Sequence, residues 1–171
     1  MAEERLGREQ IAQILPHRED MALLDEAALL EDGTAEGVYH VRGDEFFLRG
    51  HFPGNPVVPG VIQCEIIAQA SCMLMKDAIP GGTPYYAGIN SVRFRRPVRP
   101  GDTLVVRSQL VRSKGTLFVV KGEATVDGAV CASGEFMFMI AKYRGLKEPY
   151  QDMEKILRSA QDDRRFALLS S

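Results

Sequence analysis

The sequence predicts an α+β protein in which one antiparallel sheet wraps around a single long buried helix. Two observations predict this arrangement. The segment 59–77 is apolar on nearly every helical face, which is typical of a helix that is buried almost all round. The residues after it alternate between apolar and polar side chains in runs that tight turns separate, which is typical of antiparallel strands. A sheet curled around one helix buries both patterns at once.

Two strands are expected before this helix. Residues 21–30 suit a helix or a strand on propensity alone. We interpret them as a strand because residues 34–41 alternate like one, and Asp32-Gly33 between the two segments is a hairpin signal. Residues 43–58 are expected to form an irregular loop, because they are rich in glycine, proline and aromatic residues.

Two helices are expected in this part of the chain. Residues 8–14 favour a short helix that Pro16 stops. The long helix begins at Pro59, since proline suits a first helical turn, and continues to about Asp77. Three polar residues stand out on its apolar surface: Gln63, Glu65 and Gln69.

The C-terminal half is expected to form an antiparallel meander. The predicted strands are residues 85–95, 103–112, 116–126 and 129–141, with turns at 113–115 and 127–128. One side of the strand 103–112 carries Leu104, Val106, Ser108 and Leu110. A hairpin, one buried helix and then these strands make up the hot-dog fold.

Composition limits the classes of function. The 171-residue chain suits one domain, residues 1–143, followed by a polar tail, 144–171, that we expect to be partly disordered or to hold a short helix near 151–159. The net charge of −2 gives no electrostatic reason to bind nucleic acid or an anionic membrane. No run reaches the roughly 18 apolar residues of a membrane span, and the N-terminus is too polar for a secretory signal. An odd number of cysteines in apolar surroundings indicates buried thiols in a reducing, cytoplasmic compartment: Cys64, Cys72 and Cys131.

His51 and Glu65 are the candidate acid–base pair. His51 lies in the loop just before the long helix, and Glu65 lies on the helix with Gln69 four residues later on the same face. A carboxyl group that faces an apolar channel would keep its proton near neutral pH and act as a general acid, with a histidine nearby as the base. Each residue also has a plainer interpretation: a solvated loop histidine, a glutamate at the exposed helix edge, and a glutamine that bonds a loop. Spacing alone does not show that the two groups meet.

A long motif resembles the central motif of the (3R)-hydroxyacyl-acyl-carrier-protein dehydratases of bacterial fatty acid synthesis. It reads Gly50-His51-Phe52-Pro53-Gly54-Asn55-Pro56-Val57-Val58-Pro59-Gly60-Val61, then Glu65, then Ala68-Gln69. Three flanking segments also resemble the family: Leu15-Pro16-His17-Arg18, INSVRFRRPVRPGD at 89–102 and GEFMFMIAK at 134–142. The resemblance covers roughly residues 9–143 and implies a hot-dog dehydratase.

The resemblance implies a role for each matched residue. His51 would remove the α-proton of the thioester, and Glu65 would protonate the departing 3-hydroxyl. The backbone N–H of Gly60 would face the thioester carbonyl, where a helix N-terminus stabilises developing negative charge and glycine permits close approach. A carbonyl around Val57 would orient the imidazole. The other implied substrate contacts are Phe52 and Gln69.

The resemblance also implies the partners. The substrate would be an acyl chain linked through phosphopantetheine to an acyl carrier protein. No metal or organic cofactor is needed, because the thioester itself acidifies the α-carbon. Glu65 of one subunit would lie opposite His51 of another, so the unit would be a homodimer, and trimers of dimers are common in the family. Related dehydratase–isomerases have aspartate at the position of Glu65, so no isomerase activity is expected.

Some residues depart from the family or fall outside its motif. After Arg18 the family continues with a Tyr-Pro-Phe-like run that borders the acyl channel, whereas this chain has EDMA at 19–22. We interpret His17 as a structural match and His40 as a surface residue. A basic cluster is interpreted either as surface charge or as a docking site for the acidic carrier protein: Arg93, Arg95, Arg96 and Arg99.

Two other kinds of function stay open. One is a different thioester enzyme on this fold, such as a thioesterase or an enoyl-CoA hydratase. The other is a non-catalytic acyl-binding or scaffold subunit. The presence of both His51 and Glu65 argues against a non-catalytic subunit, since a homologue that has lost its activity often lacks one residue of such a pair.

Overall fold

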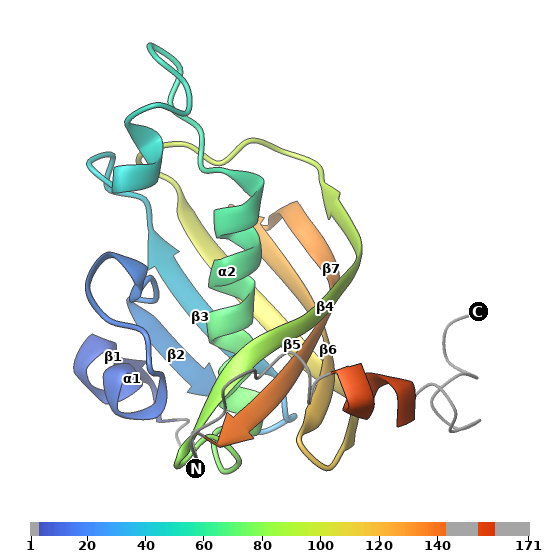
Figure 1. The fold of residues 1–171 in the computed structure, drawn as a ribbon. Helices are drawn as coiled ribbons and strands as arrows, with labels where there is room; N and C mark the ends of the chain where they lie inside the picture. Colours follow the sequence, from blue (N-terminus) through green and yellow to red (C-terminus); the bar gives the residue numbers. More distant parts are fainter. Residues whose placement is uncertain (1–3, 143–153, 160–171) are drawn as a thin grey trace.

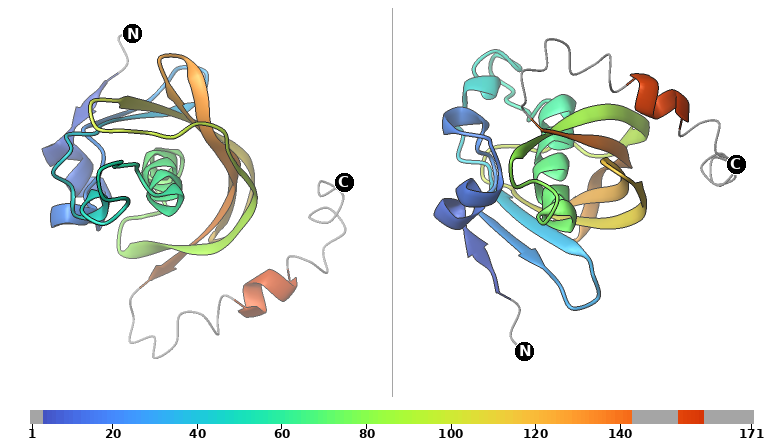
Figure 2. Two further views of the ribbon diagram at one scale, coloured as in Figure 1. Left: turned by 90° about the horizontal axis from the view of Figure 1, so that it is seen from above. Right: turned by 60° about the horizontal axis from the view of Figure 1, so that its bottom comes forward.

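The computed structural model describes residues 4–142 and 154–159, and it has the predicted arrangement of one sheet curled around one helix (Figure 1). The main elements are β1 (Leu6–Gly7), α1 (Arg8–Ile14), β2 (Glu26–Leu29), β3 (Ala35–His40), α2 (Gly60–Ser71), β4 (Gly82–Phe94), β5 (Thr103–Lys114), β6 (Leu117–Val126) and β7 (Ala129–Lys142). Short 3₁₀ turns lie at Glu19–Met21, Phe46–Leu48 and Cys72–Met75. Seen from above, the sheet bends around α2 (Figure 2).

The sheet is antiparallel throughout, with strand order β1-β2-β3-β5-β6-β7-β4. The loop and helix between β3 and β4 let β5 pair with β3 while β4 crosses to the far edge beside β7. Among the described strands, β4 therefore pairs only with β7, and its other side is an edge of the sheet. This edge and the start of α2 frame the region where the predicted site residues lie.

The core lies between α2 and the concave face of the sheet. Ile66, Ile67 and Ala70 of α2 are fully buried, and the helix packs against β3, β5 and β6. The approach is close enough to require glycine in the strand: a Cβ on Gly122 of β6 would lie 2.3 Å from Cγ2 of Ile67. The apolar surface of the helix thus predicts the core correctly.

The predicted strand at 21–30 is shorter in the structure, because its first part bonds to the helix instead of the sheet. Only Glu26–Leu29 form β2, and Glu19–Met21 form a 3₁₀ turn. The backbone of Met21 and Leu23 is hydrogen-bonded to the side chain of Gln69 on α2. A long-range contact of this kind leaves no pattern in the local sequence.

Two apolar residues are exposed where the patterns predicted burial. Leu110 was expected on the inner side of β5 with Leu104, but it is 44% exposed, just before a register shift between Leu110 and Arg112. Val61, in the first turn of α2, is 75% exposed, so the helix is not buried all round.

Other expectations concern the cysteines, the membrane and the tail. All three cysteines are free and buried, as predicted. Within the described ranges, no helix is long and apolar enough to cross a membrane. Residues 154–159 are helical, inside the range where a short helix was expected. The rest of the predicted tail, 144–153 and 160–171, lies outside the described residues, as does residue 143.

Candidate active site

The loop that carries His51 is fixed by its own hydrogen bonds and by the segment around residue 99. The Val57 N–H donates to the carbonyl of His51 at 2.8 Å, which closes the loop. Asn55 accepts a hydrogen bond from the guanidinium of Arg99, and the Val58 N–H donates to the carbonyl of Val98 at 2.8 Å. The loop is therefore anchored at both its tip and its end, which limits the movement of the imidazole.

The imidazole of His51 has a defined tautomer. Its Nδ1 lies 2.8 Å from the carbonyl oxygen of Val57, which can only accept a hydrogen bond. Nδ1 therefore carries the proton and Nε2 presents a lone pair, so Nε2 can act as a base. The ring stacks on Phe52 with a centroid distance of 4.0 Å, and the Phe52 side chain is half-exposed.

Gly60 is the first residue of α2, a few residues after His51. The first N–H groups of a helix have no carbonyl one turn earlier to bond, so they carry partial positive charge. The ring of Phe94, from the end of β4, covers Gly60 so closely that a Cβ there would lie 2.8 Å from the ring. Gly60 therefore lets an aromatic ring, or a ligand in its place, approach the helix N-terminus.

Glu65 lies in the second turn of α2 and is held through one of its oxygens. Gln69 Nε2 lies 2.9 Å from Glu65 Oε1, and His17 Nε2 lies 3.1 Å from the same oxygen. The Glu65 side chain is 17% exposed. Within the described residues, no hydrogen bond or ion pair reaches Oε2. One oxygen of the carboxyl group is thus anchored and the other is open.

The structure brings together some of the predicted residues and keeps others apart. Glu65 and Gln69 are bonded to each other, as their spacing on one helix face suggested. His51 contacts Val57 and Phe52, and no hydrogen bond or ion pair joins it to Glu65 within the described part of one chain. The candidate base His51 and the candidate acid Glu65 are therefore not bonded to each other in the described part of one chain.

Two residues beside Glu65 were missed by the sequence reasoning. His17, interpreted as only structural, contacts the carboxyl group directly, and its place in the Leu-Pro-His-Arg match was the available signal. Tyr86 of β4 donates a hydrogen bond to the carbonyl of Cys64, one residue before Glu65, at 3.0 Å. Burial, and then the charge of Glu65, raise the pKa of Tyr86, so its hydroxyl stays protonated and pins β4 to α2.

Residues 21–23, whose backbone bonds the side chain of Gln69, are also held by Arg8. Arg8 donates hydrogen bonds to the carbonyls of Ala22 and Leu23, and it pairs with Asp25 at the start of β2. Burial alone would raise the pKa of Asp25, but hydrogen bonds from His40, Arg42 and Arg8 outweigh it and lower the pKa to about 2. The exposed His40 thus has a structural partner.

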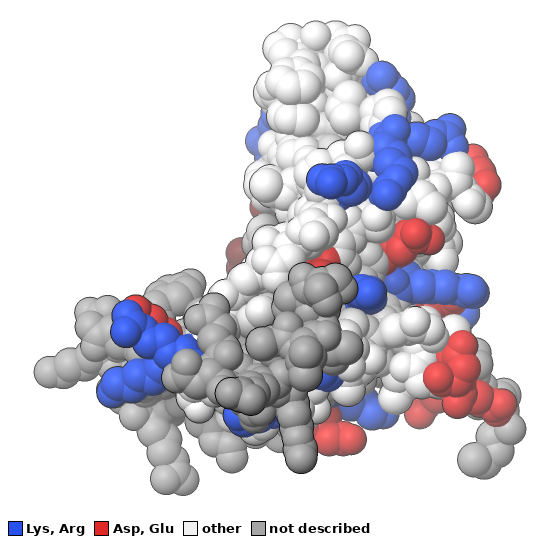
Figure 3. All heavy atoms as spheres, turned by 90° about the vertical axis from the view of Figure 1, so that its right-hand side faces the viewer, with Lys and Arg blue, Asp and Glu red and all other residues white. Residues whose placement is uncertain are grey.

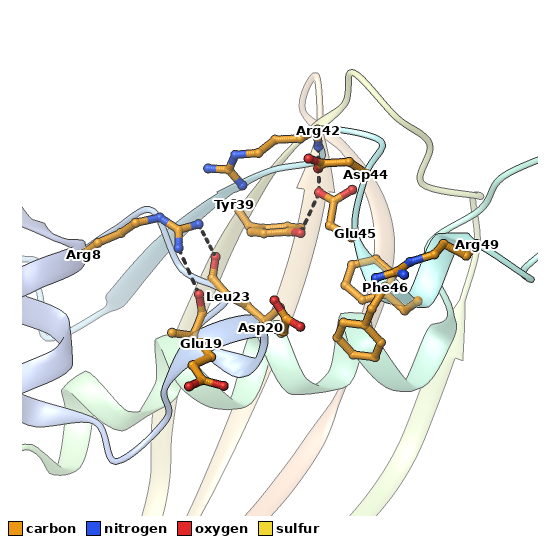
Figure 4. A pocket seen from close by; sticks show the side chains of 12 residues that line it. Arg8, Glu19, Asp20, Leu23, Tyr39, Arg42, Asp44, Glu45, Phe46 and Arg49 are labelled. Atoms are coloured by element: carbon orange, nitrogen blue, oxygen red, sulfur yellow. Dashed lines mark hydrogen bonds between the residues drawn. The ribbon is translucent and has the colours of Figure 1, made fainter.

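Arg8 also lines a cleft of about 380 Å³ next to residues 21–23 (Figure 4). The other wall of the cleft carries Tyr39, Glu45 and Phe46. Glu45 accepts hydrogen bonds from the Tyr39 hydroxyl and from the backbone N–H groups of Arg42 and Gly43. These groups serve to fix the loops around the site.

The four arginines of the basic cluster are all exposed, but they are not equivalent. Arg95 donates to the hydroxyl of Ser133, and Arg99 holds Asn55 in the loop of His51. Cationic side chains gather on the face that includes the end of β4 (Figure 3). Within the described residues, no cluster of His, Cys, Asp or Glu side chains is arranged to hold a metal ion.

Comparison with known proteins places these features in a family. A family model described as a FabA-like domain matches residues 15–135. A curated relative from Caldicellulosiruptor bescii, named 3-hydroxyacyl-(acyl-carrier-protein) dehydratase FabZ, is 44% identical over 135 residues, which cover 77% of this chain and 96% of the relative. A relative of the same name from Clostridium tetani is 44% identical over 140 residues, covering 80% and 99% of the two chains.

Solved structures share the fold at low sequence identity. The dehydratase heterocomplex ApeI:P from Xenorhabdus doucetiae aligns with a TM-score of 0.67 and 19% identity, over 85% of this chain and 96% of that one. The E. coli PaaI protein from the phenylacetic acid degradation operon aligns with a TM-score of 0.55 and 16% identity, over 77% and 88%. These likenesses show the hot-dog fold alone.

Proposed function

The chain belongs to the FabA-like family, to the branch of the 3-hydroxyacyl-acyl-carrier-protein dehydratases, and from that premise we propose that it is a cytoplasmic enzyme of fatty acid elongation. Its proposed substrate is a (3R)-3-hydroxyacyl chain linked through phosphopantetheine to an acyl carrier protein. The proposed reaction removes water and leaves the trans-2-enoyl thioester. The observation that carries the proposal is the tautomer of His51, whose Nδ1 bond to Val57 leaves Nε2 as a free base.

The proposed elimination uses three groups. Nε2 of His51 takes the α-proton, and the electron pair of that C–H bond moves toward the thioester carbonyl. The N–H of Gly60 stabilises the negative charge that develops on this oxygen, because the helix N-terminus presents unbonded N–H groups there. Glu65 gives a proton to the departing 3-hydroxyl, which leaves as water. Phe52, stacked on His51, is placed to border the acyl chain.

The proposed active unit is a homodimer, alone or in a trimer of dimers. No hydrogen bond or ion pair joins His51 to Glu65 within the described part of one chain, which is consistent with the proposal that each site combines groups from two copies. The surface around these residues suits such a contact, because it includes the sheet edge at β4 and the exposed apolar side chains of Val61 and Phe94. A protein–protein contact there would cover Val61 and complete both sites.

Arg93 and Arg96 are the best candidates of the basic cluster for carrier docking. Both lie exposed at the end of β4, and no hydrogen bond or ion pair within the described residues involves either side chain. An acidic carrier protein would be steered by such charge. Arg99 contributes to the site in another way, since its bond to Asn55 stabilises the loop of His51.

The purified chain tests this function with a 3-hydroxybutyryl pantetheine thioester. The ultraviolet absorbance of the conjugated enoyl thioester should rise with time, and no 3-cis product should appear. His51→Ala should abolish turnover and Glu65→Gln should leave only a small residual rate, since each removes one proton-transfer group while the fold survives. Folded wild-type protein that neither forms nor hydrates the enoyl thioester would refute the proposal.

The same assay separates the alternatives. A thioesterase would release free thiol, which a thiol reagent detects, and a non-catalytic subunit would leave the substrate unchanged. A cysteine nucleophile is disfavoured, because burial raises the pKa of the Cys64 thiol and raises that of Cys72 to about 12. A hydratase acting on coenzyme A thioesters would show its preference when both carriers are compared.

A further inference from the structure

We infer that His17 is a positioning residue of this site: together with Gln69 it occupies one oxygen of Glu65, so that the transferable proton resides on the other oxygen. The inference rests on the proposed function, because it assigns the atom of Glu65 that protonates the leaving hydroxyl. It depends on three observations: the orientation of the Gln69 amide, the tautomer of His17, and the unbonded Oε2 of Glu65.

The orientation of the Gln69 amide is determined by backbone groups. The N–H of Leu23 can only donate, and it lies 3.1 Å from Gln69 Oε1. The carbonyl of Met21 can only accept, and it lies 2.7 Å from Gln69 Nε2. The amide cannot be flipped without losing both bonds, so the contact with Glu65 at 2.9 Å is a donation from Gln69 Nε2 to Oε1. With the side chain 1% exposed, Gln69 has little freedom to rearrange.

The tautomer of His17 follows from its other ring nitrogen. Nδ1 is buried and has no hydrogen-bond partner, so a proton there would be an unsatisfied buried donor. A proton is therefore favoured on Nε2, which lies 3.1 Å from Glu65 Oε1 and donates to it.

Both lone pairs of Oε1 are then occupied by donors from fixed side chains. A proton on Glu65 must therefore reside on Oε2, the oxygen that no hydrogen bond or ion pair reaches within the described residues. In the elimination, the Oε2–H bond breaks, its proton joins the departing hydroxyl, and the C–O bond of the substrate breaks to release water. The carboxylate that remains keeps both donors on Oε1, while His51 holds the α-proton until solvent resets the pair.

His17 is itself held in place by its neighbour in the sequence. Arg18 donates from Nη1 to the carbonyls of Leu15 and His17, each at 2.7 Å. The backbone turn that presents the imidazole is thereby closed on both sides of Pro16. These two bonds fix the backbone from which the His17 imidazole reaches Glu65.

His17→Met and His17→Gln test the inference as a matched pair. Both replacements are close to histidine in length, but only glutamine keeps a donor that can reach Oε1. With the 3-hydroxybutyryl pantetheine thioester, we expect His17→Met to lower kcat by about 10- to 100-fold, the effect of one hydrogen bond to a charged group, with KM changed by less than about twofold. His17→Gln should restore most of kcat. Thermal unfolding of each variant checks that the fold is intact, and His17→Leu serves as a second donor-free variant.

A double substitution separates positioning from general damage. If His17 acts only through Glu65, then His17→Met should have no further effect on the residual rate of Glu65→Gln. Wild-type kcat in folded His17→Met and His17→Leu, or an equal loss in His17→Gln, would overturn the positioning role alone. The absence of turnover in unsubstituted protein would overturn the proposed function instead.

Discussion

Gln69 and Gln63 lie on the same helix and are both buried. Replacement by leucine should lower the stability of the protein at Gln69 and should not lower it at Gln63. Gln69 is 1% exposed and bonds the backbone of Leu23 and Met21. Gln63 is 3% exposed, but its Oε1 has no partner and its Nε2 has one long contact, 3.4 Å from the carbonyl of Val58. Replacement by leucine keeps the approximate volume of each side chain and removes its polar atoms.

The expected loss of unfolding free energy in Gln69→Leu comes mainly from one backbone N–H group, that of Leu23. Leu23 is buried, so its N–H would be left without a partner, which costs about 1–3 kcal/mol of unfolding free energy. Met21 is exposed, so water can replace the bond to its carbonyl. Gln63→Leu removes an unsatisfied buried oxygen, so its effect should be close to zero or stabilising, within about 0.5 kcal/mol of wild type.

Thermal unfolding followed by circular dichroism measures both effects. For a domain of this size, about 1 kcal/mol shifts Tm by about 2–4 °C, so the loss of about 1–3 kcal/mol in Gln69→Leu should lower Tm by roughly 2–12 °C. Gln63→Leu provides the control for placing leucine on this helix. Equal losses in the two variants, or a Gln69→Leu Tm within about 1 °C of wild type, would refute the assignment of Gln69 as the tie between α2 and residues 19–23.

Three further predictions follow from the charges and the packing. The pKa of Asp25 is lowered from 3.8 to about 2, so the stability that its ionised form contributes is present above about pH 4 and is lost as the pH falls toward 2. In urea unfolding at pH 7, Asp25→Asn should lower the unfolding free energy by about 1–2 kcal/mol. The difference from wild type should close between about pH 4 and pH 2. Gly122→Ala should lower unfolding free energy by about 1–3 kcal/mol, because the new Cβ meets Ile67; unchanged stability would contradict this packing. Arg93→Glu with Arg96→Glu should raise KM for the carrier-bound substrate and leave KM for the pantetheine thioester unchanged; equal effects would argue against docking.

The fold was predictable because its main patterns are local. The apolar surface of α2 and the alternation of β5 to β7 both report burial directly, and they predict a sheet around one helix. The errors come from contacts between distant residues. Residues 21–25 were assigned to a strand, yet the backbone at Met21 and Leu23 pairs with Gln69, 46 and more positions later.

The candidate site was predictable only in part. The motif around His51 is contiguous, so its hydrogen bond to Val57 is a local matter of loop length. The contact between His17 and Glu65 spans 48 positions and joins two segments that the sequence leaves unrelated. The approach of His51 to Glu65 is harder to predict from one sequence, because the two residues are proposed to meet between two copies of the chain.

Subunit complementation tests that meeting point most directly. His51→Ala and Glu65→Gln proteins, each with little or no activity alone, are mixed in equal amounts, dissociated and allowed to reassemble, and enoyl thioester formation is measured. If each site combines His51 of one copy with Glu65 of the other, half of the dimers are mixed and each holds one intact site of two, so about a quarter of wild-type activity should return. A mixture as inactive as its parents, under conditions where wild-type protein recovers after the same treatment, would contradict a site shared between subunits.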